Sequence, residues 1–510
     1  MMKTGTEAEE AKENSPKEER AGRKISCMAA LCGMLVLIVF LIPANIFLVN
    51  FPGWVMGVLC ILLCCCLAAY FLRFKTGRAA KIILPVLFAG VLFVCSFAPY
   101  LIPYWNSYTF KSYQGRILNY DEVISGRQAV DDLKTLKYYL EKLHPLFQDG
   151  LTKEVNGVYE QVLHRLEGTE QITVNDFRRE IQTVLHPIQD AHTTTYNNYP
   201  HDKYLKTAPQ KICEGYGIRS VNGKTVKQII EEAKPYYCYE TEDWINIDLG
   251  SLASLDFYGF SAPFTYEWSR DGDVITESCT EEDFVTWDEY QEIYELYSSG
   301  EESGEFVSYE IDEGKSLAVL TLTQCRYNQT YIDCVREMFT EVKRLGIQNV
   351  AVDLRGNGGG TSMVGNEFVK YLPVDSYADG SCDWRWGPFT IHCNAGSIKN
   401  RQYEDLLFNG NVYVLTDRRS FSSAKDFAML IQDNDLGQIL GEASANSVNG
   451  YGEVAGFYLP NTGLFVQIST KKWYRIDENN PEDYVFPDYP CEGGHAMEEL
   501  YKVVADGRGE

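Results

Sequence analysis

The sequence lacks several features that would point to common functions. Basic residues are not in excess, because 46 Lys and Arg stand against 71 Asp and Glu in 510 residues, for a formal net charge of −25. A nucleic-acid-binding protein needs a basic face to replace the counterions on phosphates, so nucleic acid is not an expected partner. After residue 103 there is no C-x-x-C pair, so a structural zinc site or a thiol redox motif is not indicated. The eight cysteines of this part leave disulfides and free thiols equally open.

Three long apolar stretches near the N-terminus contain no charged residue. They cover residues 25–49, 54–72 and 82–102, and each is close to the roughly 20 residues that a helix needs to cross a bilayer. Basic residues precede the first stretch and fill the loop between the second and third, whereas the turn 50–53 is uncharged. We expect a disordered cytoplasmic tail (1–24), a three-helix anchor in the lipid bilayer (25–103) and an extracytoplasmic C-terminal domain, hence a multi-pass cell-membrane protein. Buried helices of a soluble domain are the alternative.

The remaining chain divides by its hydrophobic pattern into three parts. Residues 104–205 repeat apolar residues every three or four positions and predict a helical cap, followed by an extended Thr-rich run. Residues 206–310 give a mixed signal, with a strand, a turn at Asn222-Gly223 and a helix over 217–234, and a hairpin around Asp271-Gly272. From 311 to 510 apolar strands alternate with helices, which predicts an α/β core with a mostly parallel sheet covered on both faces.

Three segments carry candidate chemistry, and each has an ordinary structural interpretation as well. VAVDLRGNGGGT (350–361) is a buried strand that runs into a glycine-rich turn, which suits an oxyanion hole but equally a tight structural turn. In TDRRSFSSAKDFAMLIQD (416–433) a turn of small residues precedes a helix. The N-terminus of that helix would stabilise negative charge that develops on Ser422 during a reaction. Alternatively, the serines are simply N-caps. Asp190-Ala191-His192 offers a general base, or a surface histidine behind a helix.

Taken together, these segments resemble the tail-specific (C-terminal-processing) serine peptidase family. The resemblance rests on DLRGNGGG, on SFSSAKDFAMLIQDNDLGQILGE with an aspartate (Asp433) eleven residues after Ser422, and on the helix that ends in LHPLF. IQDAHTTT and the closing VFPDYP extend it to roughly residues 120–490. The resemblance implies a crotonase/ClpP-like α/β core with an N-terminal helical cap and a degenerate PDZ-like insertion around GIRSVNGKTV.

Carried over position by position, the resemblance implies a catalytic site. Ser422 falls on the nucleophile, and the amides of Ser423 and of Gly359 or Gly360 fall on the oxyanion hole. The lysine of the family's Ser-Lys dyad would fall on Ser447, and no lysine occurs from 426 to 470. The tricorn-like and retinoid-binding-repeat-like branch uses an upstream histidine instead, which His192 matches.

The orienting acid and the role of Lys425 are predicted with alternatives. An acid late in the chain would orient His192, and Glu482 is our choice, although other acidic residues lie close by: Asp477, Glu478 and Asp483. Lys425 lies one helical turn from Ser422, which would bring its side chain near the site, but we expect it to point to solvent.

We therefore predict a membrane-anchored serine endopeptidase that acts on a peptide or protein substrate through an acyl-enzyme and needs neither metal nor cofactor. The oligomeric state is left open. The alternative from another class is a catalytically silent relative that binds peptides or apolar ligands at the cell surface. A sensor or transporter is a weaker alternative, because the apolar stretches lack the intramembrane charges that mark transport paths.

Overall fold

The computed structural model describes residues 107, 112–298, 306–387, 389–394 and 396–507. The chain forms two units, residues 1–113 and residues 114–510. The three predicted membrane spans lie outside the described residues. Within the described part, no helix is both long enough and apolar enough to cross a membrane.

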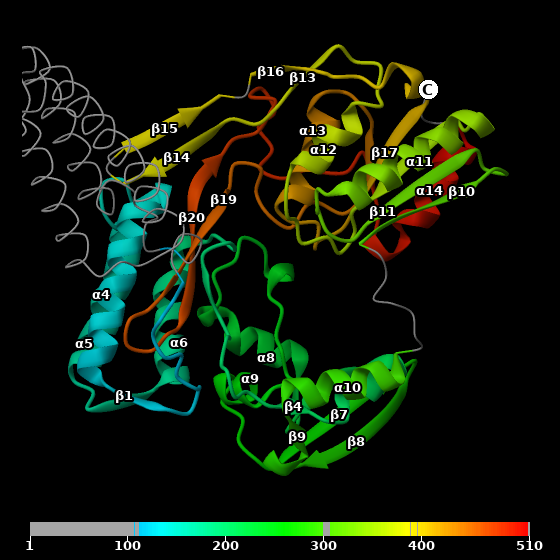
Figure 1. Cartoon of the computed structure of the whole chain (residues 1–510). Coiled ribbons are helices and arrows are strands. Elements are labelled where there is room, and N and C mark those ends of the chain that lie inside the picture. Colours follow the sequence, from blue (N-terminus) through cyan, green and yellow to red (C-terminus); the bar gives the residue numbers. More distant parts are fainter. Residues whose placement is uncertain (1–106, 108–111, 299–305, 388, 395, 508–510) are drawn as a thin grey trace, which may run out of the picture. The chain divides into compact units, whose positions relative to one another are not determined.

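A six-stranded sheet forms the centre of the C-terminal part (Figure 1). Its strand order is β10-β11-β12-β17-β18-β21; only β10 runs antiparallel to its neighbour, so the predicted mostly parallel sheet is confirmed. The strands are β10 (Val307–Asp312), β11 (Leu317–Leu322), β12 (Asn349–Asp353), β17 (Asn411–Thr416), β18 (Gln438–Gly441) and β21 (Tyr489–Pro490).

Alternate residues of these strands bury their side chains on opposite faces of the sheet, as a period of two requires. Val350 and Val352 pack into the larger core with the helices α11 (Gln329–Leu345), α12 (Met363–Val369) and α13 (Ser423–Asp433). Ala351 packs on the other face against α14 (Ala496–Ala505). The prediction that helices cover both faces is therefore confirmed.

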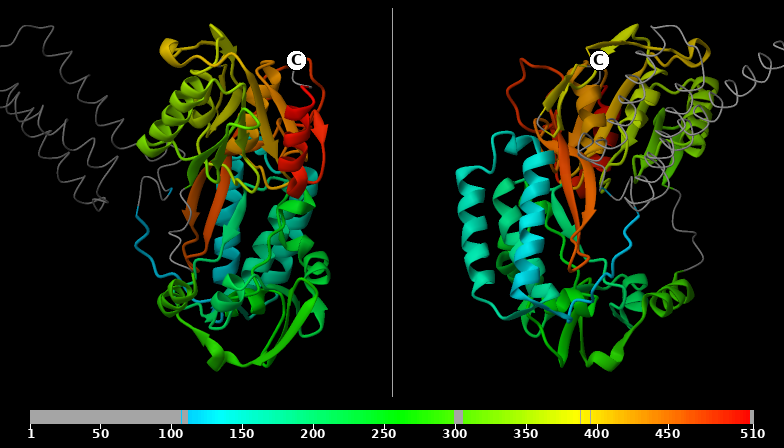
Figure 2. Two further views of the ribbon diagram at one scale, coloured as in Figure 1. Left: turned by 90° about the vertical axis from the view of Figure 1, so that its right-hand side faces the viewer. Right: turned by 60° about the vertical axis from the view of Figure 1, so that its left-hand side comes forward.

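The cap is a group of helices before residue 190, which Figure 2 shows side by side. Its elements are β1 (Val123–Ser125), α4 (Gly126–Leu143), α5 (Lys153–Glu167), β2 (Gln171–Thr173) and α6 (Val174–Leu185). A second sheet reaches the cap from the core, in the order β15-β14-β20-β19, with β3 (Thr194–Tyr196) paired to β20. Buried Asp132 of α4 fixes this contact, because it accepts hydrogen bonds from Asn461 and Thr462 in the turn between β19 and β20.

The strands of this second sheet are β14 (Cys382–Trp386), β15 (Phe389–Cys393), β19 (Tyr451–Tyr458) and β20 (Phe465–Trp473). A small separate pair is formed by β13 (Ser376–Ala378) and β16 (Ser397–Lys399). Because β20 pairs with β3 immediately after His192, this sheet connects the cap histidine to the core.

Residues 204–297 form an insertion with its own hydrophobic core. Its sheet has the order β6-β5-β7-β8, and both predicted turns are present, with φ of 48° at Asn222 and 49° at Asp271. The elements are β4 (Tyr204–Leu205), α7 (Ala208–Cys213), β5 (Gly217–Val221), β6 (Lys224–Thr225), α8 (Val226–Ala233), α9 (Leu252–Phe257), β7 (Phe264–Arg270), β8 (Asp273–Cys279), β9 (Phe284–Val285) and α10 (Trp287–Tyr297). The PDZ-like character of this insertion stays a prediction.

Candidate active site

Ser422 occupies a strained turn between the end of β17 and the start of α13. Its φ of 54° and ψ of −123° are positions that a non-glycine residue rarely adopts, at a cost of order 1–3 kcal/mol. The turn is held because the Ser422 amide donates to Asn446 Oδ1 at 2.8 Å and the Phe421 amide donates to the Asn357 carbonyl at 2.9 Å. These hydrogen bonds hold the strained turn so that Ser422 lines a cavity at the N-terminus of α13.

The N-cap interpretation of the serines does not fit Ser422. Although Ser422 stands at the N-cap of α13, its side chain makes no capping hydrogen bond. Ser420 instead has a structural role, because its buried hydroxyl donates to the Leu354 carbonyl at 2.9 Å. The hydroxyl of Ser422 is therefore not used to cap the helix, and it lies at the positive end of the helix dipole.

The glycine turn after β12 lies directly against the Ser422 turn. A Cβ at Gly359 would lie 2.7 Å from Ser422 Cβ and 3.0 Å from Ser423 N, so only glycine permits this approach. The Gly359 amide already donates to Asn357 Oδ1 at 2.8 Å. Within the described part of the chain, the amides of Gly360 and Ser423 have no hydrogen-bond partner. Of the predicted oxyanion donors, Gly360 and Ser423 are therefore available, and Gly359 provides the close contact.

Asp190 connects His192 to a second, buried histidine. His144 accepts the Leu146 amide at Nδ1, so its Nε2 carries a proton and donates to Asp190 Oδ2 at 3.1 Å. The other oxygen, Oδ1, accepts the His192 amide at 3.0 Å and lies 3.5 Å from His192 Nδ1. Burial alone would raise the pKa of Asp190, but the hydrogen bonds and charges of the two histidines hold it well below its ordinary value. Asp190 is an ionised carboxylate beside the imidazole.

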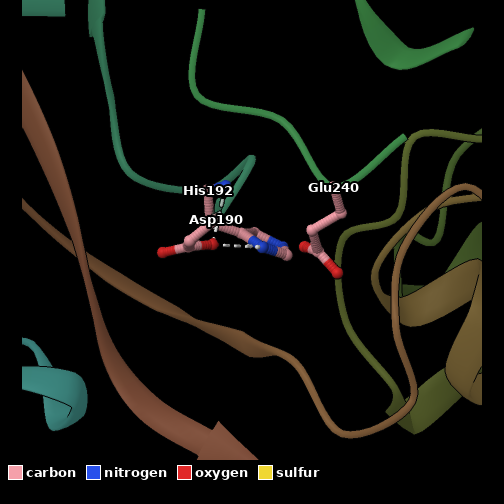
Figure 3. A group of neighbouring side chains, drawn as sticks. All are labelled: Asp190, His192 and Glu240. Atoms are coloured by element: carbon pink, nitrogen blue, oxygen red, sulfur yellow. Dashed lines mark hydrogen bonds and ion pairs between the residues drawn. The ribbon is translucent and has the colours of Figure 1, made fainter. Parts of the chain in front are cut away.

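Glu240, a residue of the insertion, supplies a second carboxylate on the other side of His192. Figure 3 shows the imidazole between Asp190 and Glu240, and one ligand-type atom from each of the three residues lies within 4.8 Å of the others. Glu240 Oε2 accepts the Ser447 amide at 2.6 Å, and Oε1 is buried without a partner in the described residues. Burial, followed by the nearby charge of Asp190, raises the pKa of Glu240 to about 7.

Sequence reasoning missed Glu240 because nothing in its segment, YYCYETEDW, resembles a catalytic motif. The one available signal is indirect. Ser447, whose amide binds Glu240, is the position at which the family resemblance would place a lysine. That position therefore belongs to the site although its residue type has changed.

The structure does not bring Glu482 to His192, so the geometry does not support that choice of acid. Glu482 is exposed, and it is the main-chain carbonyl that engages Arg475, at 3.0 Å. The alternatives lie in the same surface loop: Asp477 caps Asn479, Glu478 is exposed, and Asp483 accepts from Asn449. All four acidic residues follow the buried Arg475 in the chain, and none of them lines the cavity that contains His192.

Two further residues of α13 are buried in ion pairs. The prediction that Lys425 points to solvent is wrong, because its side chain is 3% exposed and its Nζ lies 2.6 Å from Asp426 Oδ1. Asp433, whose spacing after Ser422 belongs to the family resemblance, is the last residue of α13. It forms a buried ion pair with Arg475 at 2.7 Å that fastens the end of the nucleophile helix.

Ser422 and His192 line the same cavity, whose volume is about 990 Å³. No hydrogen bond joins them in the described structure, since neither of the two buried ring nitrogens of His192 has a hydrogen-bond partner there, and Nδ1 has only the ion-pair contact with Asp190. The His192 ring packs on Phe421 with centroids 4.5 Å apart, and Trp244 of the insertion stacks on the same ring at 3.8 Å. Hydrogen bonds between base and nucleophile are often loose until a substrate is bound.

Asp190, His192 and Glu240 each place one possible ligand atom close enough to the other two to hold a metal ion. Asp190, however, already accepts hydrogen bonds from the His192 amide, from His144 and from the Thr193 hydroxyl at 2.6 Å. Few lone pairs remain for a metal, so the arrangement suits an imidazole held between two carboxylates better. The expectation of a metal-free and cofactor-free site stays a prediction.

Parts of the chain are similar to known proteins. Residues 316–491 match the model for Peptidase family S41. Curated proteins gave no match. The fold is similar to that of mature CPAF, with a TM-score of 0.53 and 12% identity over 76% of this chain and 99% of that one. Mature CPAF complexed with lactacystin gives a TM-score of 0.50 and 13% identity over 75% and 98%. The photosystem II D1 C-terminal processing protease gives 0.40 and 14% over 74% and 97%.

Residues 316–491 therefore match an S41 peptidase domain and have the α/β fold of such peptidases, and the protein is a serine-type peptidase. The matched segment contains both the Gly359 turn and Ser422. His192, Asp190 and Glu240 lie upstream of it, in the cap and the insertion.

Proposed function

We propose that the protein hydrolyses peptide bonds through an acyl-enzyme on Ser422, with His192 as the general base. The observation that carries this proposal is the strained Ser422 at the N-terminus of α13, whose hydroxyl makes no capping bond. It lines the same cavity as His192 and lies against a glycine turn, with the amides of Gly360 and Ser423 unpaired in the described part of the chain. The proposal places this chain with the tricorn-like members of the tail-specific family, which use a histidine in place of a dyad lysine.

In the proposed reaction, His192 removes the Ser422 proton as the oxygen attacks the substrate carbonyl. The amides of Gly360 and Ser423 stabilise the resulting oxyanion, a contribution worth about 10²–10³-fold in rate per donor in other serine peptidases. The imidazolium then gives its proton to the leaving amine, and water attacks the acyl-enzyme with His192 again as base.

Asp190 orients His192 in this scheme in place of Glu482. Its Oδ1 lies 3.5 Å from Nδ1, which favours the tautomer that carries the proton there and leaves Nε2 to accept from the nucleophile. Glu240 stands on the opposite side of the ring. It is a second carboxylate that stabilises the imidazolium when ionised.

A serine-directed fluorophosphonate probe applied to the full-length protein tests the nucleophile and the base. We expect covalent labelling that is lost in Ser422→Ala and falls at least about 10³-fold in rate in His192→Ala. Ser397→Ala and His201→Ala are the matched controls, because both residues are exposed and neither lines the cavity. Glu482→Gln should label normally.

A folded wild-type protein that takes no label would contradict the proposal. That result would favour the catalytically silent surface protein, in which the 990 Å³ cavity would only bind peptides or apolar ligands. Labelling at a serine other than Ser422 would contradict the assignment of the nucleophile while leaving the peptidase class intact.

We further propose that residues 25–103 anchor the peptidase domain to the cell membrane with the domain outside. The support is the length of the three uncharged apolar stretches and the distribution of basic residues around them. Exposed Cys213 provides the test, because a membrane-impermeant maleimide should modify it in intact cells. Modification only after lysis, or full-length protein in the soluble fraction, would contradict this topology.

A further inference from the structure

Two cysteines stand directly opposite each other at the base of the β14–β15 hairpin. The antiparallel register pairs Cys382 with Cys393, and the two strands run side by side in Figure 1. Directly opposed residues of an antiparallel pair have Cα atoms about 4.5 or 5.5 Å apart. Either separation falls within the roughly 4.4–6.8 Å that a disulfide spans.

Cys382 and Cys393 differ from the other six cysteines after residue 103 because they are partners in a strand pair. No other two of these described cysteines face each other across paired strands: Cys279 lies opposite Phe264, and Cys325 bridges to Gly360. The sequence alone could not choose a pair, because Cys382 and Cys393 become neighbours only through the hairpin. All eight are free thiols in the structure.

We propose that Cys382 and Cys393 form a disulfide by exchange with a small-molecule disulfide such as oxidised glutathione. The inference concerns the hairpin alone and does not rest on the peptidase mechanism. The bond would close the hairpin at the end that joins the second sheet and hold the two strands in register.

The two thiols have different accessibility, which fixes the order of the steps. Cys382 is buried, and burial followed by the neighbouring Cys393 raises its pKa to about 12. Cys393 is partly exposed, so it is the entry thiol. Its thiolate attacks one sulfur of oxidised glutathione and releases one reduced glutathione. Cys382 then loses its proton, attacks the Cys393 sulfur and releases the second, so two protein thiols are oxidised while one glutathione disulfide is reduced to two thiols.

The bond would also stabilise one wall of the catalytic cavity. On its other edge β14 pairs with β20, where Cys382 lies opposite Trp473, and Trp473 lines the cavity. Arg385, in the same strand, donates to the carbonyls of Glu141 and Gln148 in the cap. β14 therefore contacts the cap directly and the cavity wall through Trp473 of β20.

Peptide mapping of the full-length protein tests the proposal. The protein is equilibrated with glutathione buffers of increasing oxidised fraction, treated with N-ethylmaleimide, unfolded and digested with trypsin. Trypsin cleaves after Arg385, so the two cysteines fall on separate peptides that only the new bond can join. We expect these peptides to be linked, with half-oxidation at an oxidised glutathione concentration at least about tenfold below that which half-modifies exposed Cys213.

Two variants define the order of events. In Cys382→Ser, Cys393 should accumulate the mixed disulfide with glutathione, whereas in Cys393→Ser the buried Cys382 should stay reduced. Wild-type peptides that carry maleimide on both cysteines throughout the series would overturn the proposal. So would a stable mixed disulfide on Cys393, or a link from either cysteine to a third. Because the decisive reading comes from the wild-type protein, it stands even if a variant folds poorly.

Discussion

The two sides of the candidate site are built in different ways. On the nucleophile side, β17, the Ser422 turn and α13 are consecutive in the chain, and the Gly359 turn belongs to the neighbouring strand of the same sheet. On the base side, His192 follows the cap, its partner Asp190 is held by His144 from 46 residues upstream, and Glu240 comes from the insertion. The nucleophile side therefore follows from the local sequence pattern of the core. The base side depends on contacts between residues that are far apart in the chain.

This difference predicts that the nucleophile side is the more sensitive to single changes in packing. Its two turns lie so close together that a Cβ at Gly359 would overlap Ser422, while His192 has no hydrogen bond to Ser422 and sits between two carboxylates. The predictions below test the comparison, and they run from the largest expected effect to the smallest.

Breaking the buried ion pair at the end of α13 should destabilise the nucleophile side most. Asp433→Ala would leave Arg475 as an unpaired charge, although both side chains are at most 2% exposed, so we expect the free energy of unfolding to fall by about 3–5 kcal/mol. Denaturant unfolding measures it. Glu341→Ala removes a surface pair with Arg344 and should leave the free energy of unfolding nearly unchanged. Equal losses from the two variants would show that the pair does not fasten the helix.

A methyl group at Gly359 should disrupt the contact between the two turns. In Gly359→Ala the new Cβ would lie 2.7 Å from Ser422 Cβ, on a backbone with φ of 97°, so the Ser422 turn must shift. We expect kcat/KM on a peptide substrate to fall about 10²–10³-fold, since geometric errors of 1 Å in a site have effects of this size. Gly358→Ala is the control, because its Cβ would meet nothing closer than Trp244 at 3.9 Å. A Gly359→Ala enzyme with normal kcat/KM would refute the close-approach argument.

Glu240 should make the base side less stable as the pH rises. Burial and Asp190 raise its pKa from 4.5 to about 7, against weaker lowering contributions from the Ser447 amide, His192 and Lys425. The folded state therefore binds this proton more tightly than the unfolded state. The resulting stability is complete below about pH 4.5 and is lost as the pH rises through about 7, by at most about 3 kcal/mol.

Comparing Glu240→Gln with wild type isolates this group from other titrating residues. The amide cannot ionise, so the variant should keep stability that the wild type loses, and the difference between them should grow from pH 4.5 to pH 8. Asp243→Asn is the control, because Asp243 pairs with Arg418 at the surface. Parallel stability curves for wild type and Glu240→Gln would show that Glu240 is not ionising in a buried setting.

The sequence was sufficient where local pattern decides the structure. The strand ending at Asp353, the glycine turn and the helix after Ser422 follow from apolar periodicity, from glycine and from small residues, and all lie where expected. The acid beside His192 was not predictable in this way. Glu482 was chosen because it lies late in the chain, whereas the carboxylates at the imidazole are two residues before His192 and in a separate insertion. Lys425 illustrates the same limit, since only the structure shows the Asp426 partner that lets it be buried.

The smallest effect should come from His144, which acts on the reaction only through Asp190. His144→Asn removes the Nε2–H donor at 3.1 Å and leaves Asp190 Oδ2 with the Thr193 hydroxyl alone. Losing one hydrogen bond to a buried carboxylate costs about 1–3 kcal/mol. Only the part of this energy that changes the orientation of His192 affects the rate. We therefore expect kcat to fall roughly tenfold with KM unchanged. Steady-state kinetics measures this, and Thr193→Val should give a similar loss through the other donor. A rise in KM larger than the fall in kcat would place His144 in substrate binding and not in positioning the base. An unchanged kcat in both variants would show that Asp190 needs neither donor, and the base side would then depend on Glu240 alone.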